Sequence, residues 1–399
     1  HDSKKKTIYY NNAVIKVYDI PIFYFPKFSH PDPTVDRRSG FLPPSISSSK
    51  NLGNGFSIPY FWDLGYDKNL TLTNNLYASE NPLFLGEYHQ AFRSSNLIAD
   101  FGYTEGYKKN TVKKKKGNKS HFFSKYVKNF GNRENSESTL DITLQDVSND
   151  KYLKLHKIKS NLVDYNTNTL ENSINFIHED DDIFFGFNTS IYETLNDSYE
   201  DKYEYILPEI TFDKNLFSNN KYGNLDLQTN YKVRNYETNK FTNFLVNDFN
   251  WEYKEFNSKS GFKGKLLSNF KNINYETKNV EPYKKDTTSE LFGSIGYLTE
   301  LNLLKKINDV KHSLKPKILV RYSPGSMRKD LHGNRLTTDA AFKMDRTSNT
   351  ETFETGLSST FGFDYNVQKD NSSFDFSIAQ VLSAKENKKM SSISSLDEK

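Results

Sequence analysis

The sequence predicts an all-β protein built as a large antiparallel transmembrane β-barrel, and three observations support this prediction. Apolar and polar residues alternate along short segments throughout the 399 residues, as in strands whose two faces meet different surroundings. Clusters of Asn, Asp, Gly and Ser, which favour turns, separate these segments. Aromatic residues make up 15% of the chain although its mean hydropathy is only −0.77. That combination is expected when one face of each strand meets lipid and the other a wet lumen.

Composition and charge exclude several other classes. The chain has 31 Phe and 26 Tyr, which argues against disorder. No segment approaches the roughly 18 consecutive apolar residues of a membrane-spanning helix. The 54 basic and 50 acidic residues give a net charge of only +4, so we expect no nucleic-acid partner. The absence of cysteine excludes disulfides and cysteine–zinc sites. Because the chain begins with His1, we interpret it as a mature chain or an excised fragment.

The first thirty residues differ from the rest. Residues 13–28 are denser in apolar residues and contain Pro21 and Pro26. A second proline cluster, Pro31 and Pro33, follows directly. Prolines of this density favour a linker, so we expect residues 1–30 to be the end of a separate β domain.

The later segments show the alternation clearly. Leu70 and Leu72 alternate with threonines, and residues 97–104, 140–145, 225–233, 357–365 and 374–378 follow the same pattern. Segments of roughly 8–11 residues are long enough to cross a bilayer when tilted, and they predict roughly fourteen to sixteen strands in residues 31–399. Helical periodicity is nearly absent, and the one short candidate, residues 301–306, fits a strand equally well. Soluble β-sandwich domains alternate in the same way, so periodicity alone leaves both architectures open.

Seven motifs follow one another along almost the whole chain. The most specific pair is RRSGFLPPS at residues 37–45 followed by FSIPYFW at residues 56–62. The others are VYDIPIFYFPKFSHPDP (17–33), DVSNDKYLKLH (146–156), ILPEITF (206–212), HSLKPKILVRYSP (312–324) and SFDFSIAQVL (373–382). In this order they resemble the outer-membrane lipopolysaccharide-assembly protein family (LptD, or organic solvent tolerance protein).

The resemblance implies a function and an organisation. Residues 1–30 would be the C-terminal end of a periplasmic β-jellyroll with its linker, and residues 31–399 the N-terminal part of the barrel. The jellyroll would receive lipopolysaccharide from a periplasmic bridge protein. The acyl chains would leave sideways between the first and last strands, while the sugar passes through the lumen. The resemblance also implies a plug lipoprotein of the LptE type, contact with outer-membrane lipids and a location in the cell outer membrane.

Three prolines are the candidate gate residues. Proline lacks the N–H that a strand ladder needs, and Pro43, Pro44 and Pro59 all fall in the first two expected barrel strands. By resemblance, Pro44 and Pro59 match the gate prolines of the family, whereas Pro43 stands where the family usually has an aliphatic residue. Alternatively, the prolines only mark strand ends or edges.

Other candidate contacts lie close to the expected junction of the two domains. Arg37 and Arg38 could bind lipopolysaccharide phosphates, since guanidinium groups bind phosphate bidentately. They could equally bind phospholipid headgroups or carboxylates. By resemblance, Ile15 and Val17 could contact acyl chains inside the jellyroll, although core packing explains them as well.

A basic loop follows the expected strand that ends near Tyr107. It contains Lys113, Lys114, Lys115 and Lys116, flanked by Lys108, Lys109 and Lys119. The loop could neutralise phosphates, or it could be only a charged solvated loop.

No enzyme motif is present, so we expect no covalent chemistry and no cofactor or metal. The resemblance implies transport instead. The eight His are scattered, and the acidic run of residues 179–182 fits a solvated turn better than a calcium loop. Two rival functions stay open. A porin-like barrel would need no weakened seam between strands. A secreted glycan-binding β-sandwich would stay soluble without detergent.

Overall fold

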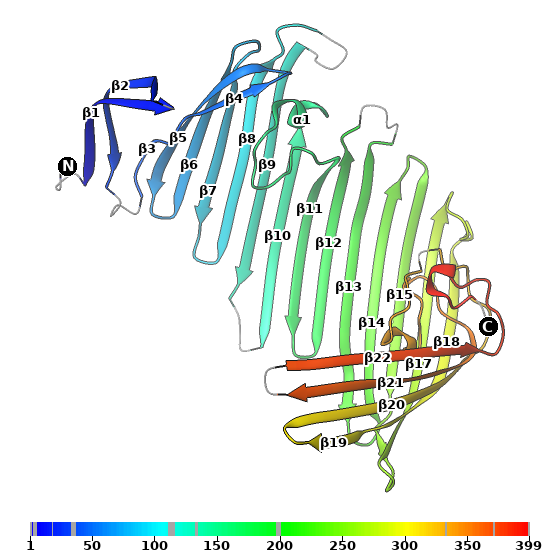
Figure 1. Cartoon of the computed structure of the whole chain (residues 1–399). Helices are drawn as coiled ribbons and strands as arrows, with labels where there is room; N and C mark the ends of the chain where they lie inside the picture. The colour runs from blue at the N-terminus through cyan, green and yellow to red at the C-terminus, as the bar shows by residue number, and fades with distance from the viewer. Residues whose placement is uncertain are drawn as a thin grey trace. The chain divides into compact units, whose positions relative to one another are not determined.

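A computed structural model describes residues 2, 6–17, 19–32, 37–110, 116–131, 135–196, 201–331, 333–369 and 372–397. The structure is almost entirely antiparallel β, with 66% of residues in strands and 3% in helices (Figure 1). This confirms the predicted all-β class. No helix in the described ranges is long and apolar enough to cross a membrane.

The chain divides into two compact units, which we describe separately. Unit 1 comprises His1–Gly131, Thr139–Ile174 and Tyr192–Lys202, and unit 2 comprises Asn132–Ser138, Asn175–Ile191 and Tyr203–Lys399. Strands β10 (Ser136–Val147), β11 (Thr169–Asp180) and β12 (Ile183–Thr194) contribute residues to both.

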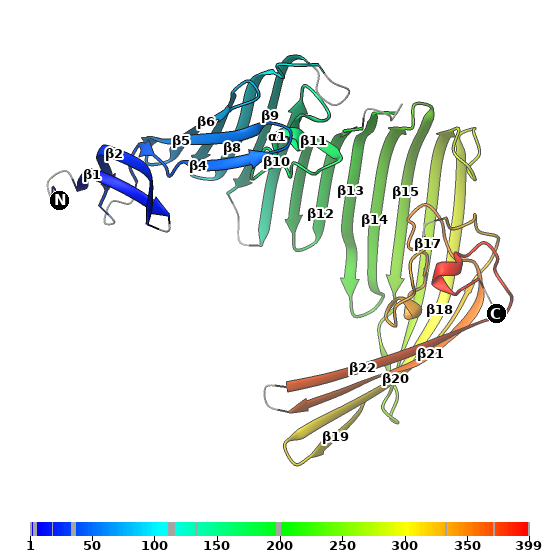
Figure 2. The same cartoon turned by 45° about the horizontal axis from the view of Figure 1, so that its top comes forward.

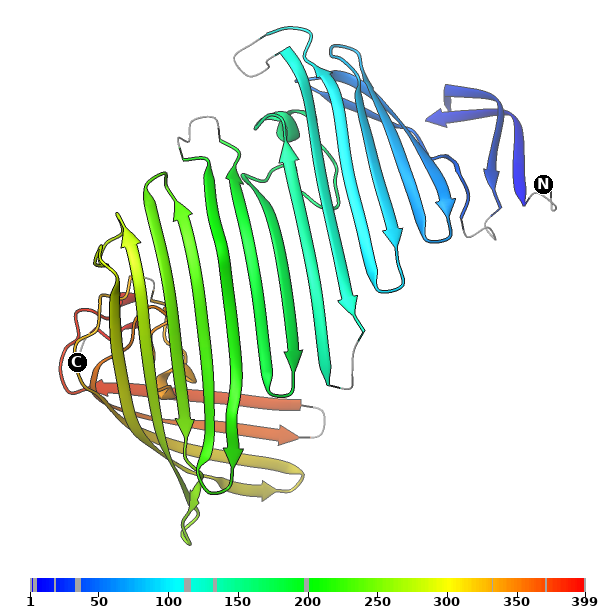
Figure 3. The ribbon, with the colours of Figure 1, turned by 180° about the vertical axis from the view of Figure 1, so that it is seen from behind.

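Unit 1 begins with a separate two-stranded sheet. Its strands β1 (Thr7–Val17) and β2 (Ile20–Pro31) pair only with each other among the described strands. This arrangement agrees with a boundary near residue 30, which stays a prediction. The next strands, seen from behind in Figure 3, are β3 (Gly40–Phe41), β4 (Ser45–Ser49), β5 (Gly53–Gly65), β6 (Lys68–Tyr77), β7 (Leu83–Ala91), β8 (Ser95–Gly106) and β9 (Lys116–Phe130). Both β3 and β4 pair with β5, and β5 to β9 pair in chain order.

Unit 2 is a second antiparallel meander of longer strands. Its strands are β13 (Tyr203–Asn219), β14 (Gly223–Tyr236), β15 (Lys240–Glu252), β16 (Phe256–Asn257), β17 (Phe262–Lys278), β18 (Thr288–Leu301), β19 (Leu303–Ile307), β20 (Val310–Ser323), β21 (Gly356–Lys369) and β22 (Ser372–Ser383). The long loop between β20 and β21 lies beside β17 and β18 (Figure 2) and contains the short helix η1 (Ala340–Phe342). A second short helix, η2 (Ser392–Ser394), follows β22.

The structure corrects two expectations. Twenty strand segments, β3 to β22, lie in the described part of residues 31–399, more than the fourteen to sixteen predicted. Part of the excess arises because β3 and β4, β15 and β16, and β18 and β19 are interrupted strands, each pair sharing one neighbour. The second difference is the helix α1 (Tyr152–His156), which lies in a motif without any helical signal in the sequence. At residues 301–306, where helix and strand were both open, strands β18 and β19 cover all residues but 302.

Candidate functional site

The first strand of the meander is interrupted opposite Pro59. Phe41 of β3 pairs with Tyr60 of β5, and Ser45 of β4 pairs with Ser57 of the same strand. Three residues, 42–44, therefore face only two, 58 and 59, so the register shifts by one residue. Such a bulge leaves ladder groups without partners and weakens pairing locally.

The three prolines named from the sequence as candidate gate residues all lie at this interruption. The Leu42 N–H donates to the Pro59 carbonyl oxygen over 3.0 Å. In an antiparallel strand, the N and C=O of one residue point to the same neighbour. The nitrogen of Pro59 therefore also points to the first strand, where it has no hydrogen to donate. From the sequence we expect Pro43 and Pro44 within a strand, but in the structure they lie between β3 and β4. Neither proline has an N–H to donate to a ladder, which explains the difference.

The interruption borders an apolar groove of about 480 Å³. Its lining comprises Phe41, Ile58, Tyr60, Leu72, Asn74, Phe84, Leu85, Phe101 and Tyr103. The Phe41 ring packs edge-on against Tyr60 with centroids 5.0 Å apart, yet the Phe41 side chain is 76% exposed. Most of the lining belongs to one face of strands β3 to β8.

The two faces of unit 1 differ sharply in charge. The groove face carries no Asp, Glu, Lys or Arg in residues 56–62, 70–76, 84–90 and 97–103, where alternate side chains point to it. The opposite face carries Glu87, Asp100, His121 and Lys125. Within these ranges the charges lie on one face only, as expected where a sheet separates lipid from water.

Helix α1 packs against the charged face. Tyr152 and Leu153 join a buried cluster with Leu83 and Phe123. His121 lies 3.2 Å from both the Tyr152 hydroxyl and the Asp100 carboxylate. Gly102 leaves room for the imidazole, since a Cβ there would lie 2.5 Å from it. Burial raises the pKa of Tyr152 well above its ordinary value, so the hydroxyl stays neutral.

Arg37 and Arg38 hold the junction between the hairpin and the meander. The Arg37 guanidinium donates to the carbonyl oxygens of Tyr66 (2.9 Å) and Lys68 (2.8 Å) and lies 3.5 Å from Asp63. Arg38 donates to the Thr7 hydroxyl over 2.5 Å. Of these contacts, the one between Arg37 and Asp63 is of the carboxylate kind that the sequence leaves open, and phosphate binding stays a prediction.

Two other candidate sets fall wholly or partly outside the described part of the chain. The backbone of Ile15 and Val17 belongs to β1, but their side chains lie outside the described residues. In the basic loop, Lys113, Lys114 and Lys115 lie outside them too. Lys108 and Lys109 are exposed, whereas Lys119 is buried in β9.

Unit 2 shows the same division between its faces. Large apolar side chains are exposed on one face: Phe270, Leu291, Ile295, Tyr297, Ile318, Val320, Tyr322, Leu357, Phe361, Phe374, Phe376, Ile378 and Leu382. No Asp, Glu, Lys or Arg of β18, β20 or β22 lies on this face. The charged side chains point the other way, among them Glu300, Lys315, Lys317 and Asp364.

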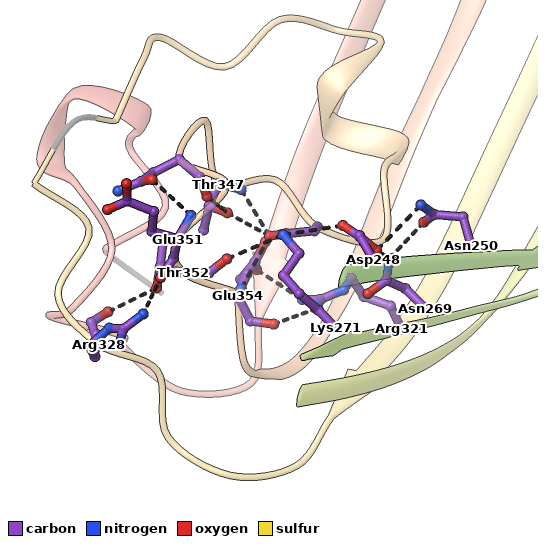
Figure 4. Close-up of polar contacts among 12 residues, drawn as sticks. Asp248, Asn250, Asn269, Lys271, Arg321, Arg328, Thr347, Glu351, Thr352 and Glu354 are labelled. Carbon is purple, nitrogen blue, oxygen red and sulfur yellow. Dashed lines mark hydrogen bonds and ion pairs between the residues drawn. The ribbon is translucent and has the colours of Figure 1, made fainter. Parts of the chain in front are cut away.

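A buried ionic network fastens the loop between β20 and β21 to the charged face (Figure 4). Lys271 of β17 lies 3.3 Å from Asp248 of β15 and 2.7 Å from Asp345 of the loop. It also donates to the Thr352 carbonyl oxygen over 3.3 Å. Lys271 is only 4% exposed, so the loop carboxylate balances a charge that would otherwise be buried alone.

A second centre of the network lies around Glu354. Arg321 of β20 lies 3.0 Å from the Glu354 carboxylate and donates to its carbonyl oxygen over 2.7 Å. Arg346 donates to both Glu354 carboxylate oxygens. Sequence reasoning missed these residues. The available signal was parity: Lys271 shares a strand face with Lys263 and Lys265, and Arg321 shares one with Lys315 and Lys317. No group of three or more His, Asp or Glu in the described ranges could hold a metal.

Comparisons with known proteins give partial matches. No family model matches the chain. The LPS-assembly protein LptD of Francisella tularensis subsp. novicida is 33% identical over 113 residues, 26% of this chain and 13% of that protein. LptD of a Shewanella species is 42% identical over 73 residues, which is 18% of this chain and 9% of that protein. LptD of Psychrobacter cryohalolentis is 35% identical over 79 residues, which is 19% of this chain and 8% of that protein. The chain thus spans a small part of the length of these relatives.

Among solved structures, BamA of Haemophilus ducreyi lacking POTRA domains 1–3 was aligned with this chain. The alignment covers 94% of this chain and 72% of the BamA chain. The sequence identity is 10% and the TM-score is 0.21, which is too low to support a common fold. The one-sided distribution of charge and the similarity to LPS-assembly proteins together indicate an outer-membrane protein.

Proposed function

We propose that this chain takes part in assembling lipopolysaccharide at the outer membrane, as part of a translocon with a lateral gate at its first strands. Lipopolysaccharide has acyl chains that belong in lipid and a sugar that belongs in water. A β-sheet with one uncharged face and one charged face can contact the acyl chains on one side and the sugar on the other, provided that two of its strands can separate. The similarity to LptD proteins supports lipopolysaccharide as the substrate.

The interrupted pairing between β5 and the first strand carries the gate proposal. A strand wall in lipid is stable because its backbone groups pair with neighbours. Here the seam between β5 and the interrupted strand β3–β4 lacks backbone N–H donors on both sides, at residues 42–44 and at Pro59. Each missing hydrogen bond lowers the cost of opening by about 1 kcal/mol. Among these strands, the seam therefore needs the least free energy to open, and acyl chains could pass there from the charged face into lipid.

The other functions receive less support. A β-sandwich buries its apolar faces against a second sheet, whereas both units leave large apolar side chains exposed on one face. A porin-like channel has no use for an interrupted seam. We further propose that transport involves no covalent chemistry, and that a periplasmic bridge protein delivers the lipid while a plug lipoprotein occupies the lumen.

The test restores the missing donors in the full-length protein. Pro44→Ala combined with Pro59→Ala adds two N–H groups at the seam. We expect surface lipopolysaccharide, measured by labelling intact cells, to fall roughly tenfold. Pro316→Ala is the matched control, because Pro316 also lies within a strand, paired with Phe363 in unit 2. Unchanged surface lipopolysaccharide in the double variant would remove the gate proposal.

A further inference from the structure

The groove beside the interrupted seam contains one amide on an otherwise apolar surface. Asn74 lies on β6 with its side chain exposed on the uncharged face. Leu72 and Leu76 flank it on its own strand, and Ile58 and Phe84 are its partners on the neighbouring strands. Asn74 is therefore surrounded on four sides by apolar side chains.

The amide has no hydrogen-bond partner among the described residues. On a surface that faces water, solvent would supply the hydrogen bonds of this amide. On a face that meets lipid, an amide without a partner costs several kcal/mol, and polar residues kept at such positions mark functional sites. A partner must therefore come from a molecule that enters the groove.

The groove restricts what that molecule can be. Apart from Asn74 its lining is aliphatic and aromatic, without Asp, Glu, Lys or Arg, so a phosphate would find no cation there. A hydrocarbon chain does fit, and an ester, amide or hydroxyl group on that chain would satisfy Asn74. Phe41, Ile58 and Tyr60 line the groove and also flank the interruption, so a chain that leaves through the seam meets this groove directly.

We propose that the groove around Asn74 is a docking site for an acyl chain of lipopolysaccharide as it leaves the seam, and that the Asn74 amide binds a polar group on that chain. This inference rests on the proposed function. It adds a place where the departing lipid pauses on the outer face of β5 to β8, after it has passed the gate.

The experiment places the photo-crosslinking amino acid p-benzoylphenylalanine at single positions of the full-length protein in cells. Position 72 reports on the groove, because Leu72 lines it beside Asn74. Position 73 reports on the opposite, charged face of the same strand. Position 295 reports on the lipid-facing surface outside the groove, where Ile295 is 53% exposed.

We expect position 72 to capture lipopolysaccharide and position 295 to capture mainly phospholipid. Asn74→Leu should lower lipopolysaccharide capture at position 72 about fivefold, and Asn74→Gln should restore it. Capture at position 72 that Asn74→Leu leaves unchanged would overturn the proposal.

Two further results separate this proposal from the proposed function. Lipopolysaccharide at position 73 with only phospholipid at position 72 would overturn the docking site and leave the transport function standing. Lipopolysaccharide at neither position would overturn both.

Discussion

The backbone N–H of Leu42 donates to the carbonyl oxygen of Pro59 over 3.0 Å, and among the described residues it is the only backbone hydrogen bond made by residues 42–44. One bond across three residues is far below the density of a regular antiparallel ladder. The seam should therefore open locally at lower free energy than the neighbouring strands.

Hydrogen exchange provides the first test of this relationship. The amides of Leu42 and Ile46 should exchange faster than those of Leu85 and Glu87 in β7. Pro59→Ala supplies the missing donor, so it should slow exchange at Leu42 by roughly fivefold, as expected for one added hydrogen bond. Exchange mass spectrometry of the protein in detergent measures both effects. Equal protection in the two regions would contradict a weakened seam.

The second prediction concerns the buried Lys271. Lys271→Met removes the cation between Asp248 and Asp345 and leaves two buried carboxylates without their partner. We expect the free energy of unfolding to fall by roughly 3–5 kcal/mol. Lys265→Met is the matched control on the same strand, because Lys265 pairs with Glu252 at the surface and should cost less than about 1 kcal/mol. Denaturant titration in detergent, followed by tryptophan fluorescence, compares the two.

The third prediction tests which face meets lipid. Ile295→Lys places a charge on the uncharged face of β18 and should destabilise the folded protein in lipid vesicles by roughly 2–4 kcal/mol. Leu298→Lys on the same strand points to the charged face and should cost clearly less. Equal losses of folding free energy for the two variants would contradict the assignment of the faces.

The fourth prediction concerns alkaline pH. Burial raises the pKa of Tyr152, so its neutral form is favoured in the folded state. Its contribution to stability is therefore complete below the unfolded pKa of about 10 and is lost as the pH rises from there toward the folded pKa. We expect proteolysis in the loop around α1 to accelerate above pH ~10. Tyr152→Phe should show a smaller acceleration, and an identical pH profile would exclude Tyr152 as its origin.

Alternation along single strands was predictable, because it is a local property of the sequence. Leu357 and Phe361 share a parity and are both exposed on the outward face, as a lipid-facing strand requires. The segment FSIPYFW, whose alternation predicts a strand, lies within β5. These features depend only on the two-residue period of a strand.

Contacts between distant segments were not predictable. Lys271 and Asp345 are 74 residues apart, and nothing in either local sequence indicates the other. Helix α1 has only five residues, too few for a helical period to appear, and its position depends on packing with Leu83 and Phe123. The role of Asn74 also emerges only when its neighbours on β5 and β7 are known.

The exposed apolar faces have a consequence for biogenesis. Before it reaches the membrane, the chain would present these faces to the aqueous periplasm, and surfaces of this kind promote aggregation. The strands therefore cannot be completed in water and then delivered. We therefore expect an escort that keeps the chain unfolded until it reaches the bilayer, where its final strand pairing would take place.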